Sequence, residues 1–428
     1  MYSIQRILMW GLVTACIMGT PLMSGAEDKI VITMTGSTVG QEGELIRAGA
    51  KLYMEQHPNV EIRVYDVPDS TTARFILYLK KLVAQSPEID LYQVDVIWPG
   101  EMAEHFIDLY QYGAEEYVDE HFAALIQNNT VDGRLVAMPW FMDAGLLYYR
   151  SDLLKKYGYA APPSTWDELE KMAKTIQDGE VAVGRENFWG FVWQGDMYEG
   201  LSCNVLEWIA SSGGGTFLDA EKNITINNPE ALRALERAKD WIGYISPPAV
   251  TGFLEEDARR WWQSGNAVFM RNWPYVYGMA NADDSPVRGK FDLAPLPGEK
   301  PGMGAATLGG WQLAVSKYSR HPAVAADIAL FMSSKTIQKM RAIQGSFNPT
   351  IPSLYDDPDV LKAAPFFGSL YDVFVNAVAR PSAQTAPQYS RATRVIFSAV
   401  HHILTGQRDV QAALDELEID LQDVLEAE

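Results

Sequence analysis

Four short segments place a tryptophan beside glycine, proline or a single carboxylate, outside any helical stripe of apolar residues. They read DVIWPGE (95–101), MPWFMDAG (138–145), RNWPYVYG (271–278) and LGGWQ (308–312). Each segment alone fits packing in the core, because bulky residues often cover glycine-rich turns. Together they indicate a surface where aromatic faces and hydrogen-bonding charged groups meet one ligand.

An uncharged, polyhydroxylated molecule such as a pyranose needs this combination. Its C–H face packs on an aromatic ring, while Asp, Glu and Arg pair with its vicinal hydroxyls. The chain is well supplied with such rings, having 12 Trp, 20 Tyr and 16 Phe. We therefore expect a saccharide-binding site without covalent chemistry.

The usual catalytic patterns are absent from the sequence. It contains no G-x-S-x-G, no H-E-x-x-H, no P-loop and no cysteine pair at metal-ligand spacing. We predict no catalytic residue, no metal site and no cofactor, and hence no enzyme. The alternative is a secreted glycoside hydrolase acting on α-glucosides, since carboxylates and tryptophans also line such sites.

The composition of the chain limits the kinds of molecule that the protein can bind. The chain has 428 residues and a formal net charge of −20, which disfavours nucleic acid and anionic membrane surfaces because both need a basic footprint. The length suggests two or three domains of about 150 residues each. A charged cargo, such as a phosphate ester or a polyamine, is a further possibility, and the mixed, sparse charges of the four segments disfavour it.

The first 26 residues have the pattern of a secretory signal peptide. Arg6 precedes an apolar run, and Ser24-Gly25-Ala26 offers a cleavage site. The competing reading is lipidation at Cys16, which ends a lipobox-like Val-Thr-Ala-Cys. If Cys16 is removed with the signal, Cys203 is the only cysteine left and no intramolecular disulfide can form. We expect a periplasmic protein, with a lipid-anchored form at the cell surface as the alternative.

Strand-like and helical patterns alternate at the start of the mature chain. Strands are predicted at 29–34, 60–67 and 94–98, and helices at 41–56 and 71–85. This order is typical of a parallel sheet in an α/β fold. Farther along, residues 321–344 are predicted to form one helix. In the strand predicted at 94–98, burying the Asp95 carboxylate costs free energy unless the group is paired or lies at the strand end.

Longer motifs resemble one family over nearly the whole mature chain. They are DVIWPGEMAEHFIDL, MPWFMDAGLLYYRSDLLKKYGY, NFWGFVWQGDMYEGL, RNWPYVYGMANADDSPVRGK and TLGGWQLAVSKYS. These segments closely resemble the trehalose/maltose-binding proteins, which are extracellular solute-binding proteins of carbohydrate ABC importers. The resemblance is weakest at residues 36–44.

The resemblance implies a two-lobe periplasmic-binding-protein fold with an interlobe cleft. A three-stretch hinge would lie near 137–143, 308–313 and 347–352. The N-terminal lobe would comprise 27–140 and 313–347. The C-terminal lobe would comprise 141–312 and 348–428.

The resemblance also implies a set of ligand-binding residues. Glu42, Arg74 and Asp95 would reach the sugar from the first lobe, with Glu44 as the substitute for Glu42. Asp143 would accept from a hydroxyl, and Trp273 would stack on one ring. Trp311 would lie against the sugar with the Gly310 amide alongside, and Arg380 would donate from the second lobe.

The function implied is that of a receptor. It would bind a neutral disaccharide (trehalose, maltose, sucrose or a related α-glucoside) and deliver it to the transmembrane permease subunits of an ABC importer. We expect it to act as a monomer.

Overall fold

The computed structural model describes residues 29–427, whose strands form two main sheets and one short hairpin. The expected signal peptide, including Cys16 and the cleavage site at Ala26, lies outside the described residues. In the described part, none of the helices combines the length and apolar character needed to cross a bilayer.

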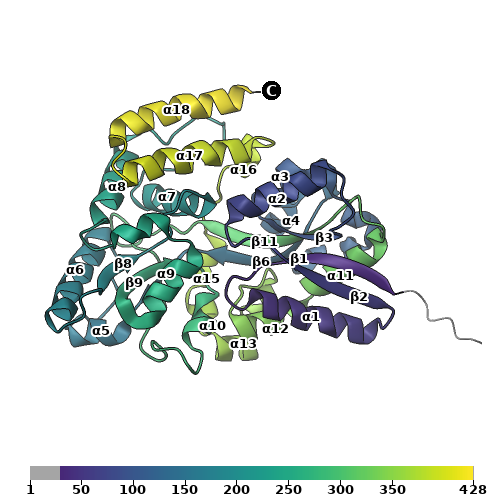
Figure 1. Cartoon of the computed structure of the whole chain (residues 1–428), viewed down its shortest axis with the longest axis horizontal. Coiled ribbons are helices and arrows are strands. Elements are labelled where there is room, and N and C mark those ends of the chain that lie inside the picture. Colours follow the sequence, from purple (N-terminus) through teal and green to yellow (C-terminus); the bar gives the residue numbers. More distant parts are fainter. Residues whose placement is uncertain (1–28, 428) are drawn as a thin grey trace, which may run out of the picture.

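The larger sheet has the strand order β2-β1-β3-β11-β6. These strands are β1 (Ile30–Gly36), β2 (Val60–Asp66), β3 (Leu91–Asp95), β6 (Met138–Ala144) and β11 (Leu308–Val315). β1 pairs in parallel with β2 and β3, as the strand and helix alternation predicts, whereas β11 is antiparallel to β3 and β6. The connecting helices α1 (Glu42–Gln56) and α2 (Thr71–Val83) lie on opposite sides of this sheet (Figure 1).

The strand predicted at 94–98 is wrong at its end, because β3 stops at Asp95. The Asp95 carbonyl accepts from the Trp98 amide (3.0 Å), and its carboxylate accepts from the Ile97 amide (3.3 Å). These two bonds turn the chain into α3 (Pro99–Met102). Asp95 therefore lies at the carboxyl end of a parallel strand, where ligands of α/β proteins commonly bind.

The smaller sheet has the order β10-β7-β9-β8. Its strands are β7 (Leu146–Tyr149), β8 (Trp189–Val192), β9 (Ala267–Asn272) and β10 (Asp292–Ala294), and the hairpin is β4 (Thr130–Val131) with β5 (Arg134–Leu135). Only Gly145 separates β6 from β7, so the chain changes sheet within one residue. The expected lobe boundaries at 140/141 and 312/313 fall inside β6 and β11, and the division into lobes stays a prediction.

Helices cover both sheets. In the half with the smaller sheet, α17 and α18 lie side by side and α7 lies next to α17 (Figure 1). The remaining helices are α4 (Ala123–Asn128), α5 (Ser151–Lys156), α6 (Trp166–Ala182), α7 (Glu199–Ser211), α8 (Pro229–Trp241), α9 (Glu255–Trp261), α10 (Val276–Ala280), α11 (Pro322–Ser333), α12 (Lys335–Gly345), α13 (Pro358–Ala363), α14 (Phe366–Ser369), α15 (Tyr371–Val375), α16 (Ser382–Thr385), α17 (Tyr389–Leu404) and α18 (Val410–Glu426).

The single helix predicted at 321–344 is wrong, because the structure has two helices there. Ser334 has an extended backbone (φ −64°, ψ 155°) between α11 and α12. Its amide donates to the Phe331 carbonyl (3.1 Å), which closes the first helix. Because of this break, α12 runs in a different direction from α11. Arg341 of α12 then lies against the Trp140 ring of β6.

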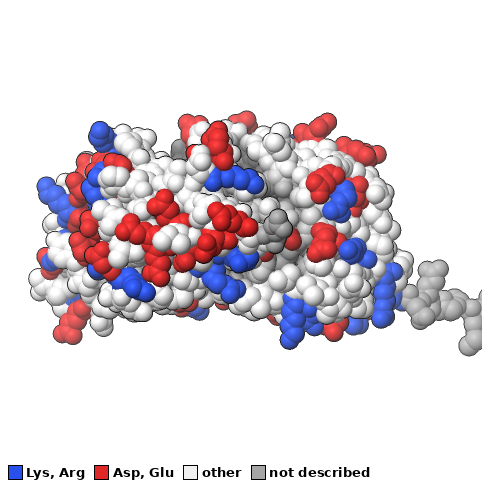
Figure 2. All heavy atoms as spheres, turned by 90° about the horizontal axis from the view of Figure 1, so that it is seen from above, with Lys and Arg blue, Asp and Glu red and all other residues white. Residues whose placement is uncertain are grey.

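The surface keeps the acidic character of the composition. α18 carries six exposed carboxylates and no Lys or Arg. Figure 2 shows acidic side chains gathered over the half of the molecule that carries this helix. This surface repels phosphate backbones and anionic lipids.

Candidate ligand-binding site

One cavity of about 630 Å³, partly open to solvent, lies where the two sheets approach each other. The first residues of four helices reach it, namely Glu42, Thr71, Glu199 and Glu255. Helix N-termini carry partial positive charge, which favours the three carboxylates placed there.

All eight residues predicted to bind the ligand line this cavity. They are Glu42, Arg74, Asp95, Asp143, Trp273, Gly310, Trp311 and Arg380. Glu44, the substitute, is exposed on the outer side of α1, whereas Glu42 is buried. The structure therefore brings the predicted set together, and their role in binding stays a prediction.

Two tryptophans of the four segments face the cavity and two do not. Trp98 and Trp140 are fully buried, so the packing interpretation holds for them. Trp273 and Trp311 are partly exposed and line the cavity. They come from different sheets, because Trp311 is in β11 and Trp273 directly follows β9.

An arginine stacks on each of these two indoles. The Arg74 guanidinium carbon lies 4.2 Å from the centre of the Trp311 ring, and that of Arg271 lies 3.8 Å from Trp273. Arg271 is fixed in turn by a buried ion pair with Glu207 (2.6 Å). The ring planes are therefore held before any ligand arrives, which reduces the entropy lost on binding.

Glycines in β11 let the indoles come close to the backbone. Gly310 has a left-handed φ of +128°, and a Cβ there would lie 2.6 Å from the Phe141 carbonyl oxygen. At Gly309 a Cβ would lie 3.2 Å from the Trp273 ring. The bare backbone in front of Trp311 is thus required by the pairing with β6 and by the second indole.

A charged network closes one side of the cavity. Arg380 Nη2 donates to Asp95 Oδ1 (3.1 Å), and its Nη1 donates to Glu199 Oε1 (2.8 Å). Tyr389 and Thr393 also donate to Glu199 (2.6 and 2.7 Å). Burial raises the pKa of both carboxyl groups, and the Arg380 charge opposes that shift. Asp95 and Arg380, both predicted to bind ligand, are therefore also partners of each other.

Other carboxyl groups in the cavity have no ion pair. The Asp143 carboxylate accepts no hydrogen bond from residues 29–427, and the residue is 7 % exposed. Its pKa is raised well above the usual value by burial and by the nearby charges of Glu42 and Asp95. Burial likewise raises the pKa of Glu42. The Glu42 carboxylate accepts from the Gln93 side-chain amide, whereas hydroxyl donors of a ligand can supply the partner that Asp143 lacks among the described residues.

Beneath this region lies an arginine without a hydrogen-bond partner. The Arg341 guanidinium is buried against the rings of Trp140 (3.7 Å) and Phe347 (4.6 Å), and its three nitrogens are unpaired among the described residues. Burial lowers its pKa to about 10, opposed by the charges of Glu42 and Asp143. Arg341 therefore offsets part of the negative charge without lining the cavity.

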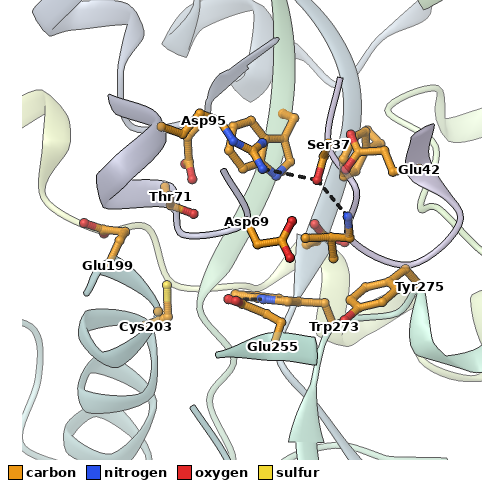
Figure 3. A pocket seen from close by; sticks show the side chains of 18 of the residues that line it. Ser37, Glu42, Asp69, Thr71, Asp95, Glu199, Cys203, Glu255, Trp273 and Tyr275 are labelled. Carbon is orange, nitrogen blue, oxygen red and sulfur yellow. Dashed lines mark hydrogen bonds between the residues drawn. The ribbon is translucent and has the colours of Figure 1, made fainter. Parts of the chain in front are cut away.

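Several lining residues were missed by the sequence reasoning. Glu199, Glu255, Asp69 and Tyr275 reach the cavity, and Figure 3 shows Glu255 and Trp273 facing Asp69 across it. Glu199 and Glu255 each begin a helix in the half with the smaller sheet. A carboxylate at a helix start is ordinarily a capping or surface charge, so nothing in the sequence selected Glu199 or Glu255. Tyr275 lies in the third segment, RNWPYVYG, which was the one signal for this part of the cavity.

Candidate metal ligands do not cluster in the part of the chain the structure describes, and its one cysteine is buried. No group of three His, Cys, Asp or Glu in residues 29–427 is arranged to hold a metal ion. Cys203 lines the cavity but is buried, and burial raises the pKa of its thiol. A thiol in that state is a poor nucleophile.

A cavity between two α/β halves, with aromatic faces and carboxylates from both, defines a two-lobe ligand receptor of the periplasmic-binding-protein class. The model of the bacterial extracellular solute-binding protein family matches residues 37–339. The chain belongs to that family.

Similar proteins agree with this assignment. A probable ABC transporter-binding protein of Deinococcus radiodurans is 48% identical over 389 residues, covering 91% of this chain and 92% of that protein. The maltose-bound structure of MalE3 from T. maritima superposes with a TM-score of 0.87 at 41% identity, covering 92% of this chain and 100% of that one. The mannitol-binding protein of Pseudomonas aeruginosa is 22% identical, covering 83% of this chain and 80% of that protein.

Proposed function

We propose that this chain is the substrate-binding protein of an ABC sugar importer and holds a neutral disaccharide in its cavity. The ligand would be trehalose, maltose, sucrose or a related α-glucoside. The observation that carries the proposal is the meeting, in one cavity, of two partly exposed indoles and of carboxyl groups without an ion pair among residues 29–427. The maltose-bound relative, at 41% identity, supports the sugar class.

In this proposal each part of the cavity has a task. Trp273 and Trp311 cover the C–H faces of the two rings, while Asp143 and Glu42 accept from hydroxyls. Arg74 has a buried, unpaired Nη1 at the cavity wall and donates to a ligand oxygen. Micromolar affinity needs about −8 kcal/mol. Two stacked rings at about 0.5–1.5 kcal/mol each beyond burial, with several charge-assisted hydrogen bonds at about 1.5–3 kcal/mol each, reach that value after association costs.

The transport step follows from the two-lobe fold. The ligand touches both halves and so favours the closed arrangement, which would then dock on the permease subunits. The three predicted hinge stretches are neighbours, because β6 pairs with β11 and the Met142 amide donates to the Asn348 carbonyl (3.1 Å). We propose secretion to the periplasm, with the signal peptide or the Cys16 lipid anchor as the two forms of the N-terminus.

The hydrolase alternative has no support among the relatives, whose names describe binding proteins. Asp95 is also ill placed as an acid or nucleophile, since Arg380 occupies its carboxylate. A phosphate ester is disfavoured because six carboxylates and two guanidinium groups line the cavity.

The experiment is a calorimetric titration of the purified protein with trehalose, maltose, sucrose, mannitol, glucose 6-phosphate and spermidine. Saturable binding of one of the three neutral disaccharides supports the proposal. Binding of spermidine or the phosphate ester alone contradicts it. Release of glucose from the disaccharides on long incubation would show a hydrolase instead.

A further inference from the structure

A side-chain contact between α3 and α17 joins the two halves of the molecule outside the cavity. The carboxylate of Glu101, on α3, accepts from the Ser390 amide (3.0 Å) and from the Ser390 hydroxyl on α17. α3 follows β3 of the larger sheet, whereas α17 packs against α7 in the other half (Figure 1). We call this contact the α3–α17 bridge.

The bridge caps a helix across the gap between the halves. Ser390 is the second residue of α17, and Gln388, at the N-cap, makes no side-chain capping bond. The first amides of a helix lack partners within the helix, and a carboxylate is a preferred acceptor there. Glu101, in the half with the larger sheet, therefore caps α17 of the other half. No side chain at the N-cap of α17 does so.

Two further polar contacts cross between the halves on the same side of the cavity. Arg380 pairs with Asp95, and the Glu199 amide donates to the Thr72 hydroxyl (3.1 Å). Asp95, Arg380 and Glu199 line the cavity, so substituting them would change ligand contacts as well as closure. Neither Glu101 nor Ser390 lines it, and the bridge can be altered by itself.

We propose that Glu101 is a positioning residue that sets ligand affinity from outside the cavity, by capping α17 and so stabilising the closed arrangement. The proposal rests on the proposed function for its ligand and for the closed arrangement that the ligand favours. A contact made only in the closed arrangement favours closure of the ligand-bound form. It therefore tightens binding mainly by slowing release.

The test uses the full mature chain with maltose as the probe. Loss of a helix cap typically corresponds to a factor of about 2–30 in an equilibrium constant. Glu101→Ala should raise the maltose Kd about 3- to 30-fold, through a faster dissociation rate in stopped-flow, with the association rate nearly unchanged. Glu115→Ala, an exposed carboxylate of the same half without a hydrogen bond to a described residue, is the matched control and should leave both rates unchanged.

A double-substitution cycle separates the bridge from a general structural effect. Ser390→Ala should also speed dissociation, and adding it to Glu101→Ala should have little further effect, because the two groups act through one contact. Additive effects, or equal dissociation rates for Glu101→Ala and the unaltered protein, would overturn the proposal.

A measurement without sugar distinguishes failure of this inference from failure of the proposed function. If the unaltered protein binds no disaccharide, the proposed function fails, and the bridge is judged by small-angle X-ray scattering of the ligand-free forms. Glu101→Ala should have a larger radius of gyration than Glu115→Ala. Equal radii in that case would overturn the inference.

Discussion

Carboxyl groups buried without a cation partner distinguish this cavity at the scale of single residues. Burial and the charges of Glu42 and Asp95 raise the pKa of Asp143, and Arg271 and Arg341 only partly oppose that shift. A protonated Asp143 can donate as well as accept, which suits a hydroxyl. In the free protein, burial of the Asp143 carboxyl group without a hydrogen-bond partner among residues 29–427 therefore costs free energy. A hydroxyl group of a bound ligand would offset that cost.

This cost predicts a pH dependence of stability. The folded pKa of Asp143 lies well above its unfolded value of about 4, so between the two values the folded form holds a proton that the unfolded chain has lost. Stability from this group therefore falls as the pH rises through that window. Asp143→Asn does not titrate there, and should gain stability relative to the unaltered protein as the pH rises above the unfolded value of about 4.

Thermal unfolding of both forms across that pH range measures the effect. The difference in melting temperature should change in favour of Asp143→Asn as the pH rises. A constant difference would mean that Asp143 ionises normally in the folded protein.

Trp311 supports the second prediction at this scale. Trp311→Ala should weaken binding of the preferred disaccharide by at least about tenfold, because it removes both the burial and the stacking of a ring. Trp189→Ala is the control, since Trp189 is also half-buried but does not line the cavity. Calorimetry measures both, and unchanged affinity in Trp311→Ala would show that this indole only packs.

Among the elements, β11 positions more of the site than any other single strand. It carries Gly309, Gly310 and Trp311, and it lies between Asp95 on β3 and Asp143 on β6. Its register shifts between Trp311 and Gln312, next to the left-handed Gly310. The irregular backbone thus lies at the cavity, where strained conformations are often found.

Gly310→Ala should therefore disturb the strand. A methyl group would meet the Phe141 carbonyl in a conformation that costs a non-glycine residue about 1–3 kcal/mol. The variant should lose about that much free energy of unfolding, or more, and bind sugar more weakly. Gly113→Ala has a left-handed φ but no atom within 4 Å, so it should lose less.

Chemical denaturation of both glycine variants gives the comparison. Equal losses would show that backbone conformation alone, and not the contact with β6, makes glycine necessary at position 310.

How much the sequence predicted depends on the kind of pattern. The α/β order follows from apolar periodicity, and Asp95 could be selected from the residues alone because a carboxylate in an apolar strand needs a reason. Asp143, Trp273, Gly310 and Trp311 lie in the four aromatic segments, and the family resemblance gave each a role. Glu42, Arg74 and Arg380 were assigned by the resemblance alone. Glu199 and Glu255 were missed because a carboxylate at a helix start looks like an ordinary cap, and contacts between distant segments leave no local pattern. The break at Ser334 lies in the polar run Ser-Ser-Lys-Thr (333–336), and the prediction of one helix overlooked this interruption of the apolar spacing.

For the whole molecule, binding should be linked to stability. A ligand that binds only the folded protein stabilises it by about 2.7 kcal/mol at a concentration of 100 times Kd. The preferred disaccharide should therefore raise the melting temperature, with a rise that grows with the logarithm of its concentration. A disaccharide that shows no calorimetric binding should leave the melting temperature unchanged, and an equal rise with every sugar would indicate a solvent effect.

The place of β11 in the larger sheet also affects how the chain is made. β3 has β1 on one side, and β11 on the other side comes from residues 308–315. At about 5–20 residues per second, a ribosome releases β11 on the order of ten to forty seconds after β3. Throughout that time the nascent chain carries an unpaired strand edge, which exposes it to aggregation unless a chaperone covers it.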